Sequence, residues 1–163
     1  MNASVNSLTL HNDQSESVLA SDLLDWAAKQ NPWRTFDATG YSWYVGEQKV
    51  RLVGKDLYLC LLPDSSGFIC FERDQFPNNC TLLDAYGKER MRLTVPWQLT
   101  TANNPASNAP PTSFAGISQP YINPADGKKG QFGVKAWVEF AGEYYFELHW
   151  RTGQFLWGKE IRF

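Results

Sequence analysis

The chain has 163 residues, of which 43% are apolar and 15% aromatic, and its formal net charge is −2. This content of apolar and aromatic residues excludes an intrinsically disordered chain, and the charges are too evenly interspersed for a surface that binds nucleic acid or an anionic membrane. A chain of this length can bury roughly two-thirds of its unfolded surface. We therefore expect residues 1–163 to form a single domain that needs neither disulfides nor a metal to fold.

The N-terminal region is expected to be an arm followed by one helix. Residues 1–14 are polar and have no apolar period, so they are predicted to form a polar N-terminal arm. Within residues 17–30 apolar side chains recur at helical spacing, and Asn31 and Pro32 would end a helix. We expect the apolar stripe of this helix to pack on a sheet; a helix that binds a partner is the alternative.

From residue 41 onward the apolar period changes to two, which is the period of a β-strand. The run from residue 57 to 62 is apolar without alternation, so it is predicted to be the central strand, covered on both faces. The segments on either side of residues 85–88 are expected to form a hairpin. Six segments bounded by turn residues are predicted as strands: Tyr41–Val45, Gln48–Val53, Asp56–Leu62, Phe68–Arg73, Cys80–Leu83 and Glu89–Val95.

The three cysteines, Cys60, Cys70 and Cys80, stand ten residues apart and lack the paired CxxC spacing of a metal site. Their interval matches the spacing of successive strands, so we interpret them as buried free thiols. A bridge between Cys60 and Cys70 or a bound metal are the alternatives. The N-terminus also lacks the basic start and apolar run of a secretory signal. Free thiols without an export signal indicate a cytoplasmic protein.

Residues 96–131 are predicted to form a long loop, because prolines interrupt a stretch rich in Asn, Ser and Thr that has no apolar period. Loops of this length are usually functional or disordered. Phe114, Ile117, Tyr121 and Ile122 are the side chains that could anchor it. A binding role and a passive insertion both fit this composition.

The last thirty residues have the most regular pattern in the chain. Apolar and polar side chains alternate over residues 134–140 and again over residues 144–151. A three-residue loop at 141–143 would place Val138 opposite Phe146 and keep the apolar side chains on one face, whereas a two-residue loop would mix the faces. We therefore predict an antiparallel hairpin with an odd loop or an equivalent bulge.

A third strand extends this hairpin to a meander, through a two-residue turn at Thr152 and Gly153 that would place Leu148 opposite Trp157. The predicted fold class is mainly β (α+β). We expect an antiparallel meander of about eight or nine strands, with one N-terminal helix packed on it. The sheet should be curved or partly closed, because so many aromatic rings must share one core.

No nucleophile elbow, HExxH motif, phosphate-binding loop or dinucleotide fingerprint occurs, so no catalytic residue, metal or cofactor is assigned. Any half-solvated sheet shows alternating polar residues, but Trp, Tyr and Arg are also the residues that dominate interface energy. The best polar constellation is the outer face of the C-terminal meander, which we predict to be the partner-binding surface: Trp137, Glu139, Tyr145, Glu147, His149 and Arg151.

By elimination, the sequence predicts a non-catalytic domain that binds a macromolecule. The most concrete form is an inhibitor or immunity-type protein that binds and occludes a partner protein. One alternative is a carrier of a small apolar ligand, with a pocket inside the curved sheet. Another is a hydrolase or lyase that uses Glu147 and His149. Neither nucleic acid nor a membrane is expected as partner, and the sequence does not determine the partner's identity or the oligomeric state.

Overall fold

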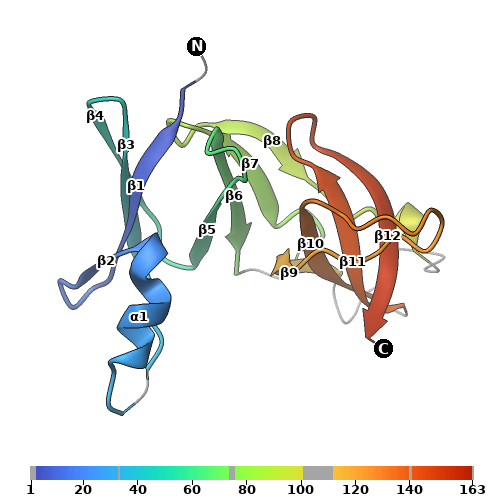
Figure 1. Ribbon diagram of the computed structural model, residues 1–163, viewed down its shortest axis with the longest axis horizontal. Coiled ribbons are helices and arrows are strands. Elements are labelled where there is room, and N and C mark those ends of the chain that lie inside the picture. Colours follow the sequence, from blue (N-terminus) through green and yellow to red (C-terminus); the bar gives the residue numbers. More distant parts are fainter. Residues whose placement is uncertain (1–2, 33, 74–75, 101–111, 140, 163) are drawn as a thin grey trace. The chain divides into compact units, whose positions relative to one another are not determined.

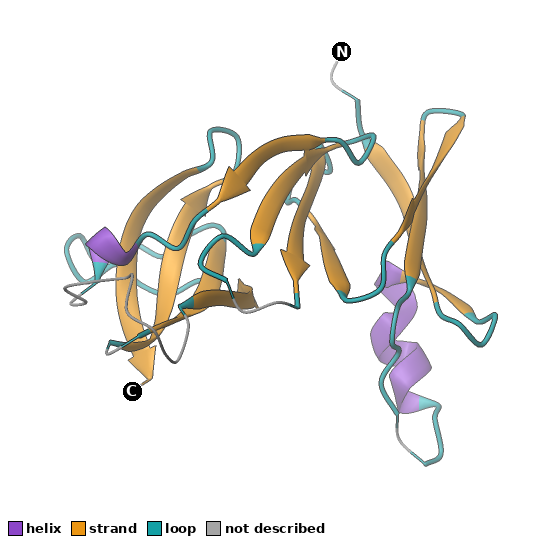
Figure 2. Cartoon of the chain, turned by 180° about the vertical axis from the view of Figure 1, so that it is seen from behind, coloured by secondary structure: helices purple, strands orange, loops and turns teal. Residues whose placement is uncertain are grey.

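The computed structural model of the chain describes residues 3–32, 34–73, 76–100, 112–139 and 141–162 (Figure 1). In this part of the chain twelve strands form three four-stranded sheets, and the helices are short (Figure 2). The predicted mainly β fold with antiparallel pairing is thus confirmed, with more strands than the eight or nine expected. None of the described helices is long and apolar enough to cross a membrane.

The chain divides into two compact units. Unit 1 contains Met1–Cys70 and Leu83–Lys88, and unit 2 contains Phe71–Leu82 and Glu89–Phe163. That residues 1–163 form one domain stays a prediction. One sheet contributes residues to both units, and its order is β5 (Leu57–Leu61), β6 (Gly67–Glu72), β7 (Cys80–Asp84) and β8 (Glu89–Leu93).

The sheet of unit 1 has the order β2 (Ser17–Leu19), β1 (Val5–His11), β3 (Gly40–Val45) and β4 (Gln48–Val53). The prediction of an N-terminal arm over residues 1–14 is therefore wrong, because β1 is an interior strand of this sheet.

The sequence conceals β1 because a bulge breaks its alternation. The pairing with β3 shifts register between Asn6 and Thr9, and Ser7 has a positive φ of 58°. The buried side chains of the strand, Val5, Leu8 and Leu10, are consequently spaced by three and then two residues instead of by two throughout.

The predicted helix over residues 17–30 is shorter than expected. Its first residues, Ser17–Leu19, form β2, a 3-10 turn follows at Ala20–Asp22, and the α-helix α1 covers only Leu23–Ala28. Residues 17–19 form backbone hydrogen bonds with β1 and are therefore not part of a helix. Leu23 packs against the core of unit 1 and Leu24 is exposed, so only part of the apolar stripe is buried.

The six strands predicted between residues 41 and 95 are found as β3 to β8, with ends that differ by no more than two residues. The choice of residues 57–62 as the central strand is wrong. In its sheet β5 is an edge strand, with Leu59 buried but Tyr58 and Leu61 exposed. The neighbouring β6 has five buried residues out of six. The apolar run at residues 57–62 therefore does not correspond to a strand that is covered on both faces.

The core of unit 1 is organised around Trp43. Its ring packs on Phe68 with centroids 4.5 Å apart, and its indole Nε1–H donates a hydrogen bond of 2.6 Å to the carbonyl oxygen of Ala85. The buried residues of this core come from both sheets to which unit 1 contributes: Val5, Leu8, Leu10, Tyr41, Trp43, Val45, Leu59, Phe68, Cys70, Leu83 and Ala85.

None of the three cysteines forms a disulfide, and Cys70 and Cys80 are buried as predicted, whereas Cys60 is partly exposed. Burial raises the pKa of Cys60 to about 12, so it stays a protonated thiol. The alternative of a Cys60–Cys70 bridge is not found. No group of three or more metal-binding side chains occurs among the residues that the structure describes.

Unit 2 is built on the sheet β12 (Gln154–Arg162), β11 (Gly142–His149), β10 (Gly133–Val138) and β9 (Ser113–Ser118), in that order. In Figure 1 β10, β11 and β12 are drawn in orange to red.

The predicted loop over residues 96–131 is only partly correct. It contains a 3-10 turn at Trp97–Leu99 and the strand β9, and residues 101–111 lie outside the described part. β9 was missed because Gly116, with a φ of 143°, lies at a bulge that breaks the alternation. Of the predicted anchors Phe114 is buried, whereas Ile122 is exposed.

The predicted odd loop between β10 and β11 is found, but two residues earlier in the chain. Val138 pairs with Gly142, and Val134 pairs with Phe146, so the three connecting residues are 139–141. Because the displacement is even, the side chains of β10 and β11 stay on the predicted faces. Val134, Val138 and Phe146 are fully buried on the apolar face.

The turn into β12 differs from the prediction, and the difference moves Trp157 to the other face of the sheet. His149 pairs with Gln154, and Leu148 pairs with Phe155 instead of Trp157. A bulge follows, so that Glu147 pairs with Trp157. Trp157 therefore lies on the same face as Glu147, opposite to the apolar face on which the sequence placed it.

The assignment of β1 as a core strand predicts that Leu10→Ala destabilises the protein by about 2–5 kcal/mol, because it leaves a cavity in unit 1. Urea denaturation followed by tryptophan fluorescence measures the loss. The matched control is Asn6→Ala on the same strand, where the side chain is exposed and the change should stay within about 0.5 kcal/mol. Equal stability of the two variants would contradict a core role for β1.

Candidate functional site

The six residues of the predicted partner-binding surface do not lie on one exposed face. Trp137 is 39% exposed, and His149 and Arg151 are also exposed. Glu139, Tyr145 and Glu147 are buried, so the expectation that they face solvent is wrong. Their role in partner binding stays a prediction, and it can now apply directly only to the three exposed residues.

Glu139 and Trp137 lie toward the loop between β10 and β11, away from Glu147 and His149. Glu139 is in the loop between β10 and β11, and its backbone N–H donates to the hydroxyl of Thr112 at 3.0 Å. Trp137 pairs with Glu143, which is four residues along β11 from Glu147. At the rise of an extended strand this is a separation of roughly 13 Å.

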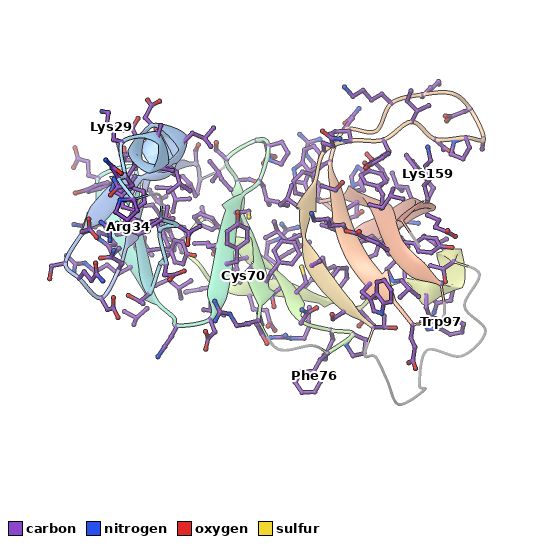
Figure 3. All side chains as sticks on the ribbon, turned by 90° about the horizontal axis from the view of Figure 1, so that it is seen from below. Lys29, Arg34, Cys70, Phe76, Trp97 and Lys159 are labelled. Atoms are coloured by element: carbon purple, nitrogen blue, oxygen red, sulfur yellow. The ribbon has the colours of Figure 1, made fainter. Side chains whose placement is uncertain are left out.

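Tyr145 and Glu147 are buried because the segment from Tyr121 to Phe132 lies against them. The ring of Tyr121 packs on that of Tyr145 with centroids 5.2 Å apart. On β12, the ammonium of Lys159 lies 5.7 Å from the centroid of the Tyr121 ring, and Figure 3 shows its side chain. The polar face of the meander is therefore covered by the chain itself over this part.

The carboxylate of Glu147 holds this cover segment. The backbone N–H groups of Gln131 and Phe132 donate to its Oε2 at 2.8 and 3.3 Å, and the hydroxyl of Tyr145 donates to its Oε1. Both oxygens accept hydrogen bonds, which is the role of an ionised carboxylate. Burial, the hydrogen bond to Glu147 and the charge of Glu147 raise the pKa of Tyr145, which keeps it a donor.

Two glycines, Gly130 in the cover segment and Gly133 at the start of β10, allow the backbone to come this close to β11. A Cβ atom at Gly130 would overlap the Glu147 carboxylate, and a Cβ atom at Gly133 would overlap the ring of Tyr145. The backbone of Gly130 is also fixed, because its N–H donates to the carbonyl of Tyr121 at 2.9 Å. Close approach of the backbone is therefore the reason for glycine at both positions.

An open cavity of about 360 Å³ lies beside this network, within unit 2. Glu147 forms its buried part, the partly buried rings of Trp150 and Trp157 also line it, and exposed charged residues such as Lys128 and Lys129 reach it from the segment between β9 and β10. Trp157 belongs to the cavity because of the β12 bulge. The alternation in the sequence placed Trp157 on the other face of the sheet, so it did not indicate that Trp157 lines this cavity.

At the end of the β11–β12 hairpin, His149, Trp150 and Arg151 form one cluster. The rings of His149 and Trp150 stack with centroids 6.5 Å apart, and the guanidinium of Arg151 lies 5.3 Å from the centroid of the Trp150 ring. The Nδ1 of His149 lies 3.0 Å from the hydroxyl of Thr152. Leu156 is 50% exposed and lines the cavity beside this cluster.

The geometry disfavours the two alternatives to partner binding. His149 and Glu147 line one cavity but share no hydrogen bond in the described part of the chain, and both Glu147 oxygens already accept bonds from the protein. The pair is therefore not arranged as an acid–base couple. The charged residues Glu147, Lys128 and Lys129 also make this cavity a poor fit for an apolar ligand.

No family model matches the chain, and no curated protein matches it in sequence. In the solved structure of Tne2 in complex with Tni2, one chain has a similar fold, with a TM-score of 0.73 and 11% sequence identity. The similarity covers 97% of the present chain and 99% of that chain. At this identity the comparison establishes a shared fold over nearly the full length of both.

The Tyr145–Glu147 contact predicts that stability falls at alkaline pH. An unfolded tyrosine loses its proton near a pKa of 10.0, whereas folded Tyr145 keeps it because its pKa is raised. Above that pH the folded state therefore binds more protons than the unfolded state, and unfolding becomes easier. The stabilisation is complete below the unfolded pKa and is lost as the pH rises through the folded one.

Urea midpoints of the wild type and Tyr145→Phe, measured from about pH 8 to about pH 11, test this expectation. The stability difference between the two proteins should shrink as the pH rises. Tyr41 and Tyr58 also have raised pKa values, and subtracting the variant removes their contribution. A difference that does not change with pH would count against the contact.

The role of Gly130 predicts that Gly130→Ala destabilises the protein by about 1–3 kcal/mol, because the new methyl group must displace a carboxylate that three donors hold. Gly40→Ala is the matched control, since a Cβ atom there would meet only the Leu52 carbonyl oxygen, at an ordinary 3.6 Å. Thermal unfolding of both variants gives the comparison. Equal melting temperatures would show that the cover segment does not depend on close approach.

Proposed function

We propose that this chain binds another protein and occludes it, in the manner of an immunity-type inhibitor. The proposed contact area, called the hairpin-end surface, consists of His149, Trp150, Arg151 and Leu156 around the mouth of the unit 2 cavity. It retains His149 and Arg151 of the predicted surface and adds Trp150 and Leu156, which line the cavity together with His149.

The observation that carries this proposal is the cluster of Trp150 with its stacked neighbours, His149 and Arg151. Tryptophan and arginine contribute most of the binding energy in many interfaces, above all next to a pocket that excludes water. The indole here already contacts the His149 ring and the Arg151 guanidinium, so little conformational entropy is lost when a partner covers it. The adjoining cavity can accept a side chain of the partner.

The fold comparison supports the same proposal. Tne2 and Tni2 bind each other in the structure that contains the similar chain. A fold shared over nearly the full length with a member of a two-protein complex favours partner binding for the present chain. The cytoplasmic location expected from the sequence is part of the proposal.

This proposal predicts that His149→Ala/Arg151→Ala weakens partner binding by at least about tenfold in Kd, because it removes both side chains that flank Trp150. Affinity capture from the native source, with quantitative mass spectrometry, identifies proteins enriched by the wild type but not by this variant. Calorimetry with the purified candidate gives the Kd, and an activity assay of that candidate measures inhibition.

The matched control is Leu24→Ala/Val53→Ala, which removes two exposed apolar side chains of unit 1. It should bind the partner as the wild type does. Undiminished binding by the hairpin-end variant would refute the proposed surface. A partner that keeps its full activity when saturated with this protein would refute the inhibitory role.

A further inference from the structure

A second polar cluster lies in unit 1, across three neighbouring strands. His11 on β1 is paired with Ser17 on β2 and with Gly40 on β3, and Ser42 stands two residues further along β3. The Nδ1 of His11 lies 2.7 Å from the hydroxyl of Ser17, and its Nε2 lies 2.7 Å from the hydroxyl of Ser42. The imidazole is thus held between two serine hydroxyls.

This cluster lies on the face of the sheet opposite to the core. Leu10, Val18 and Tyr41, which are the chain neighbours of His11, Ser17 and Ser42, are buried in unit 1. The cluster is therefore not needed to fill the core.

The environment of His11 favours the neutral imidazole. Burial lowers the pKa of His11, and the charges of Arg51 and Lys49 on β4 lower it further. The nearby carboxylate of Glu16 is bound to the guanidinium of Arg34 at 2.7 Å. A neutral imidazole has one donor and one acceptor nitrogen, so two hydroxyl partners satisfy it fully when Ser42 accepts from Nε2–H and Ser17 donates to Nδ1.

The two serines differ in exposure. Ser42 is only 5% exposed and can orient the ring, whereas Ser17 is exposed on β2, an edge strand of its sheet. Ser17 also lines an open cavity of about 530 Å³ that includes Asp22, Trp26 and Lys29. Figure 3 shows Lys29 beside the helix α1. A small electrophile can therefore reach the hydroxyl whose proton His11 is placed to accept.

We propose that Ser17 is a nucleophilic serine that takes up an acyl or phosphonyl group from a small activated ester or fluoride, with His11 as its general base and Ser42 as the positioning residue. The Oγ of Ser17 forms the new bond to carbon or phosphorus while its proton moves to Nδ1 of His11. The bond to the leaving group breaks, and the leaving group departs with the electron pair. His11 then releases the proton to the leaving group or to water.

This activity is independent of the proposed partner binding, because the residues belong to a different unit. It also accounts for a feature that partner binding does not use, which is a histidine with a lowered pKa beside an exposed hydroxyl. No pattern in the sequence indicated it, since the bulge in β1 hides the strand that carries His11.

The test uses the intact protein and a biotinylated fluorophosphonate, followed by peptide mapping by mass spectrometry. Wild type should carry one adduct, on Ser17, formed with release of fluoride. Ser17→Ala should abolish it, and Ser15→Ala, which removes an exposed serine two residues away, should leave it unchanged. The absence of an adduct on Ser17 of the folded wild type, or equal labelling of Ser15 and Ser17, would overturn the proposal.

The base is tested by the rate of labelling. His11→Ala should lower the rate at least about a hundredfold, and added imidazole should restore part of it, which a loss of folding would not allow. The wild-type rate should rise with pH through a midpoint below 6.5, the ordinary pKa of histidine. Wild-type rates in His11→Ala, or a wild-type rate without this midpoint, would exclude His11 as the base.

Ser42 is tested separately as the positioning residue. Ser42→Ala should lower the labelling rate about tenfold and move the midpoint of the pH profile, whereas Ser42→Thr should keep both because it retains the hydroxyl. An unchanged rate and midpoint in Ser42→Ala would remove Ser42 from the proposal.

Discussion

The structure of unit 2 depends on one buried carboxylate. Glu147 accepts two backbone N–H groups from the segment that leads into β10, and it accepts the hydroxyl of Tyr145 from its own strand. Leaving these donors unpaired in a buried site would be costly, so the segment and the sheet stay together. The same contact buries Tyr145 and Glu147 on the polar face of the meander, and the cavity lies beside it.

The position of the cavity follows from this arrangement together with the bulge in β12. The bulge moves Trp157 to the face of Glu147, so that an indole and a carboxylate line the same space. The hairpin ends beside it with Trp150 in contact with His149 and Arg151. A surface of this kind suits recognition of another protein better than it suits catalysis, because both carboxylate oxygens of Glu147 already accept hydrogen bonds from the protein.

The two proposals concern different parts of the molecule and different chemistry. In unit 2 the proposed surface consists of aromatic and charged side chains. These side chains contribute binding free energy only when a partner covers them. In unit 1 the proposed nucleophile depends on the two hydrogen bonds of the His11 imidazole, which place His11 to accept the proton of the Ser17 hydroxyl. Since neither cluster includes a residue of the other, each can be altered without direct effect on the other.

The sequence by itself determined the mainly β class, the strands between residues 40 and 95, and the side-chain faces of β10 and β11, because alternation with period two survives any even shift of register. It could not determine β1, β9 or the face of Trp157, since one extra residue at a bulge reverses the alternation and leaves no local trace. Only the tertiary structure decided that Glu147 is buried and that His11 lies between two serines. The backbone contacts of Glu147 and the contact of His11 with Ser42 join residues 15 to 31 positions apart in the chain, and they depend on register and on which segment covers which face.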